Sequence, residues 1–365
     1  MPNRSWLAAP LIAVIGSMGC NDSTASSSFT SVDGGTSSGS GDSGVANTGH
    51  TVTLLSSLGD SSLGESVYSL QIDATSAYAL VTNYNGTSDS TVIVKAPLSG
   101  GAAVTLATDA QYASWLALSG DALYWVDPSG PSDVDASSRT TGLVMSVPTG
   151  GGAPTTLASD QSFPAIVAAD TTGVYWVNEN QCTQPPCSAS VASILVLPPG
   201  ASTPVVLANV QAQPSTLALD ATNVYWGTSD GRVMKAPKSV TSGGPVTQLA
   251  YYETNVQRLA VGPSNLYWAT GTGDILATPI AGGPSSAIVV GSQTIGGLAV
   301  DAATLYWIAS DFDGTNTVNA LGLVGLGGVP TILWSGSDTP DGIQIDDANV
   351  YFTTQSGSLW KLTPK

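Results

Sequence analysis

The chain has 365 residues, of which 42% are apolar and only 10% are charged. Its 26 Asp and Glu residues outnumber 9 Lys and Arg residues, which gives a formal net charge of −17. A surface of that sign repels nucleic-acid phosphates and anionic lipid headgroups, so neither is expected as a partner through charge. The apolar fraction is sufficient for a substantial core, in two average domains or one large all-β ring.

The first twenty residues are typical of an export signal. Arg4 supplies the positive start, Trp6–Ile15 the short apolar core, and a zone of small residues leads to Cys20. This end resembles a bacterial lipoprotein signal, which predicts a signal peptide over residues 1–19 and a lipid on Cys20. The protein is then exported and anchored to the cell envelope, in the periplasm or on the outer surface, and meets the membrane only through that lipid. Ordinary cleavage nearby, leaving a free thiol, is the alternative.

Residues 20–50 are nearly all Ser, Thr, Gly and other small polar residues. Such a segment buries too little apolar surface to offset its ordering entropy, so we predict a disordered tether.

The remaining two cysteines, Cys182 and Cys187, enclose four residues. In an exported protein this spacing favours a local disulfide. Zinc is the weaker alternative, because two thiols and the chain's one histidine, His50, leave a four-ligand site incomplete.

From residue 51 onward an aromatic marker, a Tyr followed in most copies by Trp or Phe, recurs seven times. The spacing of its first Tyr ranges from 39 residues (Tyr267 to Tyr306) to 51 residues (Tyr124 to Tyr175). Each copy divides into four short strands, a to d, with the pair on strand b. This period predicts an all-β β-propeller of seven four-stranded blades over residues 51–365, with six blades as the alternative. The pairs are Tyr78-Ala79, Tyr124-Trp125, Tyr175-Trp176, Tyr225-Trp226, Tyr267-Trp268, Tyr306-Trp307 and Tyr351-Phe352.

The two ends of the repeat region complement each other. The last copy stops after its third strand, and an unassigned d-like strand lies at residues 51–56. We therefore predict that this N-terminal strand pairs in the last blade and closes the ring. Burial of Val52 and Leu54 is expected to help offset the loop entropy of closure.

The repeated residues are interpreted as structural. Large aromatic side chains on strand b are expected to fill the wedge between blades rather than form a sugar-stacking surface. The Asp five residues before the Tyr suits a tight a–b turn better than catalysis. It occurs in five copies, as Asp73, Asp170, Asp220, Asp301 and Asp346.

The Tyr-Trp strand with its preceding Asp resembles the YWTD β-propeller repeats of the low-density-lipoprotein-receptor type, and bacterial exported propellers with the same pattern. The resemblance covers residues 51–365 and implies architecture only. The Thr-Asp that follows Tyr-Trp in that family is mostly replaced here, and only Asp127 keeps the Asp. Those receptor propellers have six blades.

The links between strands b and c differ most among the copies. They are long at residues 83–91, 127–141, 178–193 and 310–319, and all b–c links leave a propeller on one face. Because loops on a rigid scaffold concentrate binding residues, this face is predicted to bind a partner. The candidate binding residues are Tyr84, Asp127, Asp133, Asp135, Arg139, Glu179, Asp311, Phe312 and Asp313.

These patterns favour a non-catalytic, monomeric propeller lipoprotein that binds a protein or glycan. The alternative is an exported hydrolase or lyase acting at the mouth of the central channel. His50 lies at the tether junction and no nucleophile–base pair is visible, so catalysis is not expected. No cofactor is expected. Residues 311–316 resemble a calcium loop only weakly, because they lack its distal Glu, and a solvated turn is favoured.

Overall fold

The computed structural model describes the chain from residue 45 to its end, with gaps. The described ranges are 45–46, 49–59, 65–83, 90–108, 113–128, 142–179, 192–239, 243–291, 293–311, 313–323 and 328–365. All of them belong to the compact unit Asp42–Lys365. The predicted signal peptide, Cys20 and most of the predicted tether lie outside the described residues. Within these ranges we find no helix of the length and apolarity needed to span a membrane.

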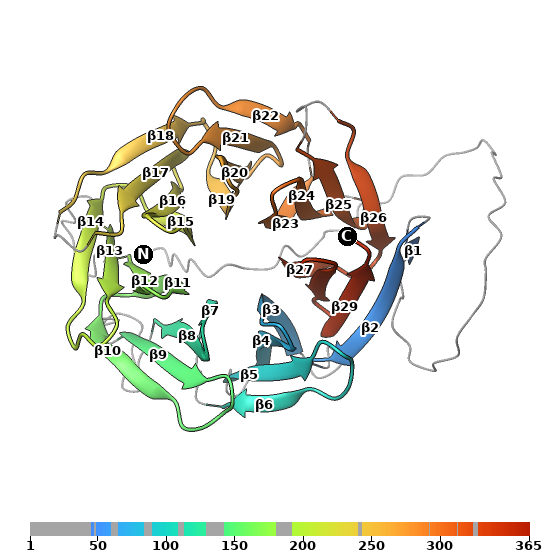
Figure 1. Cartoon of the computed structure of the whole chain (residues 1–365), viewed down its shortest axis with the longest axis horizontal. Coiled ribbons are helices and arrows are strands. Elements are labelled where there is room, and N and C mark those ends of the chain that lie inside the picture. The colour runs from blue at the N-terminus through green and yellow to red at the C-terminus, as the bar shows by residue number, and fades with distance from the viewer. Residues whose placement is uncertain are drawn as a thin grey trace, which may run out of the picture. The chain divides into compact units, whose positions relative to one another are not determined.

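The described residues of this unit form seven antiparallel sheets in a ring, and the innermost strands of neighbouring sheets contact one another (Figure 1). Strand a of each blade lies at the channel and strand d at the outer rim. Seven four-stranded blades are therefore confirmed, and the six-bladed alternative is wrong.

The strands follow the predicted a to d order. Blade one consists of β3 (Glu65–Ile72), β4 (Ser76–Asn83), β5 (Ser90–Pro97) and β6 (Val104–Ala107). Blade two consists of β7 (Leu116–Ser119), β8 (Ala122–Asp127), β9 (Gly142–Pro148) and β10 (Thr155–Gln161). Blade three consists of β11 (Pro164–Asp170), β12 (Gly173–Asn178), β13 (Ala192–Leu197) and β14 (Val205–Val210). Blade four consists of β15 (Pro214–Leu219), β16 (Asn223–Thr228), β17 (Arg232–Pro237) and β18 (Thr247–Tyr251).

The other three blades repeat this order. Blade five consists of β19 (Val256–Val261), β20 (Asn265–Thr270), β21 (Ile275–Pro279) and β22 (Ser286–Val289). Blade six consists of β23 (Thr294–Val300), β24 (Thr304–Ser310), β25 (Asn316–Gly322) and β26 (Thr331–Gly336), extended by β1 (Val45–Ala46). Blade seven consists of β27 (Pro340–Ile345), β28 (Val350–Thr354), β29 (Ser358–Thr363) and the N-terminal β2 (Thr51–Ser57).

The aromatic residues of strand b form the cores between blades. Trp125, Trp176, Trp226 and Trp268 are fully buried, and each belongs to a hydrophobic cluster that draws on two adjacent blades. Both faces of a b strand are buried because a propeller blade packs on a neighbour at each side. The interpretation of these residues as wedges is confirmed.

The a–b turns are organised by the repeated Asp. The Asp220 carboxylate accepts hydrogen bonds from the backbone N–H groups of Thr222 (2.7 Å) and Asn223 (2.6 Å), and the Tyr225 hydroxyl donates to its other oxygen (2.6 Å). The same contacts recur at Asp73 with Tyr78 (2.7 Å) and at Asp346 with Tyr351 (2.8 Å). The predicted turn-forming role is confirmed, and the Asp also fixes the b-strand Tyr.

These Asp–Tyr pairs predict how stability depends on pH. Burial alone would raise the pKa of Asp73 and Asp346, but their hydrogen bonds outweigh it and the pKa of both is lowered from 3.8. Burial and the Asp bond raise the pKa of Tyr78 and Tyr351 from 10.0 to about 12. A lowered carboxyl pKa costs stability as pH falls below about 4. A raised phenol pKa costs stability as pH rises from about 10 to 12.

We therefore expect the melting temperature to fall on both sides of a plateau around neutral pH. The double substitution Tyr78→Phe with Tyr351→Phe should flatten the alkaline decline. It should also reduce the acidic decline in part, because the Tyr hydroxyls are among the hydrogen bonds that lower the pKa of Asp73 and Asp346, whereas the backbone turn contacts remain. Circular dichroism melts from pH 3 to 12 measure both declines. Equal alkaline slopes for parent and variant would contradict this assignment.

The N-terminal strand closes the ring as predicted. Strand β2 pairs with β29 from Thr51↔Thr363 to Ser57↔Ser358, and Figure 1 shows these ends of the sequence, blue and red, side by side. The expected burial of Leu54 is wrong: Leu54 is 50% exposed and Leu55 is 6% exposed. The register shifts between Leu54 and Ser56, and this irregularity turns Leu55 toward the core instead. Val52 is half-buried, as expected.

A second short strand precedes the predicted start of the domain at residue 51. In β1, Val45 pairs with Ser335 and Ala46 with Trp334 at the outer edge of blade six. Between β1 and β2, the His50 ring nitrogen Nδ1 lies 2.7 Å from the Pro364 carbonyl oxygen. His50 therefore sits beside the closing strand at the rim of blade seven.

Candidate functional site

The b–c links of the described blades differ as the sequence predicts, with one correction. They cover residues 84–89, 128–141 and 179–191 in blades one to three, against 229–231, 271–274 and 355–357 in blades four, five and seven. In blade six the link covers only residues 311–315, not 310–319. Asn316 to Asn319 pair with β24 as the start of β25, so they extend the sheet rather than the loop.

Four of the predicted binding residues are described, and they lie in blades two, three and six. Asp127 ends β8 and is buried, at 7% exposed. Glu179 follows β12 in the neighbouring blade, and its backbone N–H donates to the Phe163 carbonyl oxygen (3.1 Å). Asp311 and Asp313 lie together in blade six. The remaining candidates lie outside the described residues, as do both cysteines of the predicted disulfide: Tyr84, Asp133, Asp135, Arg139, Phe312, Cys182 and Cys187.

The blade-six link is a hydrogen-bonded turn. The Asp311 N–H donates to the Thr315 carbonyl oxygen (2.8 Å), and the Gln293 side-chain amide donates to the Asp311 carboxylate (2.7 Å). The Asp313 carboxylate accepts the Thr315 N–H (2.8 Å), and this bond lowers the pKa of Asp313. Across the described ranges, no group of three or more His, Cys, Asp or Glu residues is arranged to hold a metal ion.

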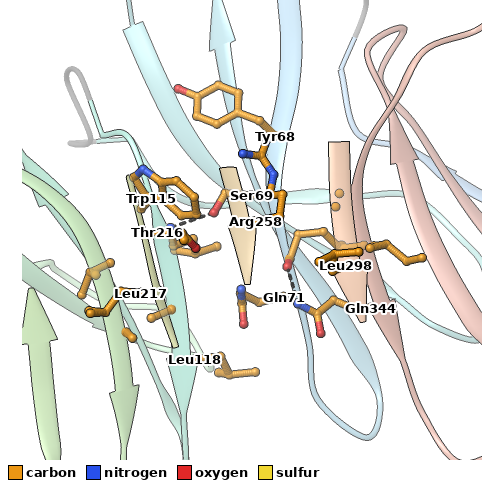
Figure 2. Close-up of a pocket in the computed structure, with 18 of the residues that line it drawn as sticks. Tyr68, Ser69, Gln71, Trp115, Leu118, Thr216, Leu217, Arg258, Leu298 and Gln344 are labelled. Carbon is orange, nitrogen blue, oxygen red and sulfur yellow. Dashed lines mark hydrogen bonds between the residues drawn. The ribbon is translucent and has the colours of Figure 1, made fainter. Parts of the chain in front are cut away.

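A cavity of about 520 Å³ lies where the innermost strands of all seven blades meet. Figure 2 shows its lining, with Tyr68, Trp115, Arg258, Gln71 and Gln344 among the labelled side chains. None of these was a predicted site residue, because the sequence argument placed function on the b–c links. The strand register shows where they lie along the channel.

Strand a begins, and strand b ends, at the b–c face, as the pairing of Val256 with Thr270 beside link 271–274 shows. The b-strand Tyr pairs near the opposite end of strand a. Its partner is alanine in five blades, Ala117, Ala168, Ala218, Ala260 and Ala299. In blades one and seven the partners are Gln71 and Gln344. The ring of small apolar residues is therefore broken at two adjacent blades.

The level nearer the b–c face is more varied. There, Tyr68 pairs with Leu80 in blade one, Trp115 directly precedes β7, and Arg258 pairs with Ala269 in blade five. Six of the seven a–b pairs show a register shift at this level. Bulges re-aim side chains and are common next to functional sites. The channel thus carries alanine in five blades and glutamine in two at one end, and more varied side chains at the end shared with the b–c links.

Hydrogen bonds to backbone carbonyls of its own blade and of the neighbouring blade hold the Arg258 guanidinium in place. Its Nε donates to the Gly296 carbonyl oxygen (2.6 Å) and its Nη1 to the Gln257 carbonyl oxygen (3.0 Å). Burial lowers the pKa of Arg258 and raises the pKa of Asp341 in blade seven, and the opposite charge of each partly counters both shifts. The pair forms no ion pair within 4.0 Å, unlike Lys365 and Asp301 (2.9 Å).

Two hydrogen bonds between neighbouring blades position other residues of the lining. The Gln344 side chain donates to the Leu70 carbonyl oxygen (3.0 Å), across the closure between blades seven and one. The Leu116 N–H donates to the Ser69 hydroxyl oxygen (2.8 Å), and Ser69 has a φ of 61° in the β3 bulge. A non-glycine residue in this backbone region is uncommon and marks a locally constrained site.

The sequence did contain a signal for this site. Strand a reads as apolar residues and alanine in most copies, so Gln71, Gln344, Arg258 and Asp341 are departures from the repeat. Loop length, on which the sequence prediction rests, carries no information about these strand positions. Strand a residues face the channel only in the closed ring, which a single copy does not reveal.

No protein-family model and no curated protein sequence matches the chain. Solved propellers do. Virginiamycin B lyase from Staphylococcus aureus, in a catalytically inactive variant with quinupristin, has a TM-score of 0.59 at 14% identity, over 87% of this chain and 100% of that one. BamB from Moraxella catarrhalis has a TM-score of 0.51 at 13% identity, over 86% and 98%.

A third similar structure is the acylaminoacyl peptidase of Pyrococcus horikoshii, with a TM-score of 0.56 at 8% identity, over 80% of this chain and 49% of that one. Identities this low show a shared fold and carry no activity across. By sequence repeat, strand order and structural similarity alike, this chain is a seven-bladed β-propeller.

Proposed function

We propose that this protein is a non-catalytic binding propeller, exported and anchored to the bacterial cell envelope through a lipid on Cys20, whose b–c face binds a protein or glycan partner. One observation carries the proposal. The blades differ from one another on the same face in two independent ways, in the lengths of the b–c links and in the side chains at the channel mouth. The a–b turns on the opposite face repeat one Asp-centred pattern in most blades.

This contrast supports binding because a scaffold needs uniform contacts, whereas a recognition surface needs particular ones. The Asp–Tyr turns and Trp wedges are repeated because every blade must pack on its neighbours. The channel-mouth residues also contact neighbouring blades, as Arg258 does at Gly296, but their identities differ from blade to blade. The acidic balance of the chain favours a partner that is not polyanionic.

The test is affinity capture from bacterial envelope extracts, with the captured molecules identified by mass spectrometry and glycan analysis. In the key variant, links 128–141 and 179–191 are each replaced by a short turn like that of residues 229–231. The matched control removes residues 201–203, exposed in a c–d turn on the opposite face. We expect the same captured partner for parent and control and its loss in the key variant. Undiminished capture after trimming would place the site elsewhere.

An exported hydrolase or lyase at the channel mouth is the second candidate. The observation that favours it is Asp341, a carboxyl group with a raised pKa in a cavity, since such groups serve as general acids or bases. The purified propeller is assayed against glycosides, lactones and peptides with and without calcium. Turnover that is lost in Asp341→Asn supports this candidate, and absence of turnover for all three classes rejects it for them.

A further inference from the structure

We infer that the channel mouth is a binding site for a neutral saccharide, a hydroxyl-rich small molecule held between Arg258 and Asp341. The inference rests on the proposed function and narrows its ligand class to a glycan. The cavity volume of about 520 Å³ lies within the range of about 300–1,000 Å³ typical of small-molecule sites.

The fold leaves several polar groups of the cavity lining available to bind a ligand. Two of the five N–H groups of Arg258 are bonded to backbone carbonyls, so three remain for a ligand. Among the described residues, neither the Asp341 carboxylate nor the Gln71 amide has a hydrogen-bond partner. All three side chains line the cavity. Polar groups in a partly desolvated site gain most from a ligand that completes their hydrogen bonds.

The charged groups of Arg258 and Asp341 are separated from each other within the cavity. Arg258 belongs to blade five and Asp341 to blade seven, and blade six contributes Gly296 and Gly297 between them. Among the described residues, no ion pair within 4.0 Å joins Arg258 to Asp341. The two charges stay apart, each facing the cavity, instead of neutralising each other in an ion pair.

The two opposite charges in the lining favour a ligand without net charge. An anion drawn to Arg258 would be repelled by Asp341, and a cation drawn to Asp341 would be repelled by Arg258. A hydroxyl group both accepts a hydrogen bond from a guanidinium and donates one to a carboxylate. Adjacent hydroxyls on one ring therefore satisfy both charged groups without adding net charge to the cavity.

Trp115 provides an apolar surface in the lining of the cavity. Trp115 is half-buried, lines the cavity and packs at its other side against the clusters of blades two to four, which hold its ring in place. Figure 2 shows Trp115 with Arg258 and Tyr68 at one end of the lining and Gln71 further along it. An aromatic face beside hydrogen-bonding groups suits a sugar ring, which has an apolar face and a hydroxylated edge.

The test is titration of the purified propeller with neutral methyl glycosides of hexoses and N-acetylhexosamines and with the corresponding disaccharides. Binding is detected by ligand-observed NMR and quantified by calorimetry. We expect at least one saccharide to bind, and its Kd to rise by about 10-fold or more in Asp341→Asn. The matched control is Asp347→Asn, the same change at an exposed carboxylate in the a–b turn of blade seven on the opposite face, and its Kd should stay within about twofold of the parent's.

A second variant guards against misfolding of the first. Gln71→Ala installs the residue that five other blades carry at this level, so it should fold normally and weaken binding by about fivefold or more. No binding by any saccharide in the panel, binding of free amino acids or dipeptides instead, or equal affinity in parent and both channel variants would each overturn the inference. The proposed function is contradicted by a different result, which is undiminished partner capture after the b–c links are trimmed.

Discussion

Removal of residues 51–57 is expected to lower the melting temperature of the propeller by about 10 °C or more. This segment is β2, which pairs along β29 and joins the two ends of the ring. Each ladder hydrogen bond contributes about 1 kcal/mol and burial of Leu55 about 1.5–3 kcal/mol. The Leu55 carbonyl oxygen also accepts the Gly101 N–H of blade one (3.0 Å), so the strand ties blade seven to blade one.

A matched pair of point variants tests the register as well as the closure. Leu55→Ala removes a buried side chain of the hydrophobic cluster that also contains Leu98 and Leu359, and should cost about 2–5 kcal/mol. Leu54→Ala changes a side chain that is 50% exposed, and should cost about 0.5 kcal/mol or less. Denaturant unfolding followed by tryptophan fluorescence gives both values.

The closure assignment predicts one order of effects: the deletion, then Leu55→Ala, then Leu54→Ala. A deletion variant that melts with the parent would show that β2 does not hold the ring closed. If Leu54→Ala were the more costly point change, the register shift in β2 would be wrong and the regular alternation expected from the sequence would hold.

The comparison of Leu54 with Leu55 illustrates what the sequence can predict. The closure strand was found from its likeness to other d strands, because strand identity depends on a pattern repeated many times. The residue of this strand that faces the core was predicted wrongly, because one bulge reverses the alternation of side chains. Nothing in the sequence TVTLLSS marks the position of that bulge. The same holds for Asn316 to Asn319, which continue a sheet although they read as a polar link.

The candidate site shows the same division. Tyr225 and Asp220 were interpreted correctly, since their spacing recurs in several copies and a local turn explains it. Arg258 and Asp341 are far apart in sequence, and each breaks the repeat only once. They line one cavity only because the ring closes, which is a tertiary fact. Sequence comparison among copies can mark such departures, but only the closed ring shows which of them meet.

Gly231→Ala is expected to destabilise the propeller by more than about 4 kcal/mol, or to prevent folding altogether. Gly231 lies in the short link of blade four and has a φ of +89°, where a side chain is strained. A Cβ atom there would lie 1.7 Å from the Tyr252 carbonyl oxygen. That carbonyl cannot move away easily, because the Tyr252 N–H donates to the Gly231 carbonyl oxygen (2.9 Å) and fixes the two segments together.

Gly200→Ala is the matched control, because it separates backbone strain from the clash. Gly200 has a φ of +75° in a c–d turn, and a Cβ atom there would meet no atom within 4 Å. Its substitution should therefore cost only the strain of a positive φ, about 1–2 kcal/mol. Soluble yield and thermal melts of the two variants measure the difference. Equal losses of stability in the two variants would mean that the blade-four link can move to accommodate a side chain. In that case the link would not be closely packed against the segment around Tyr252 that leads into blade five.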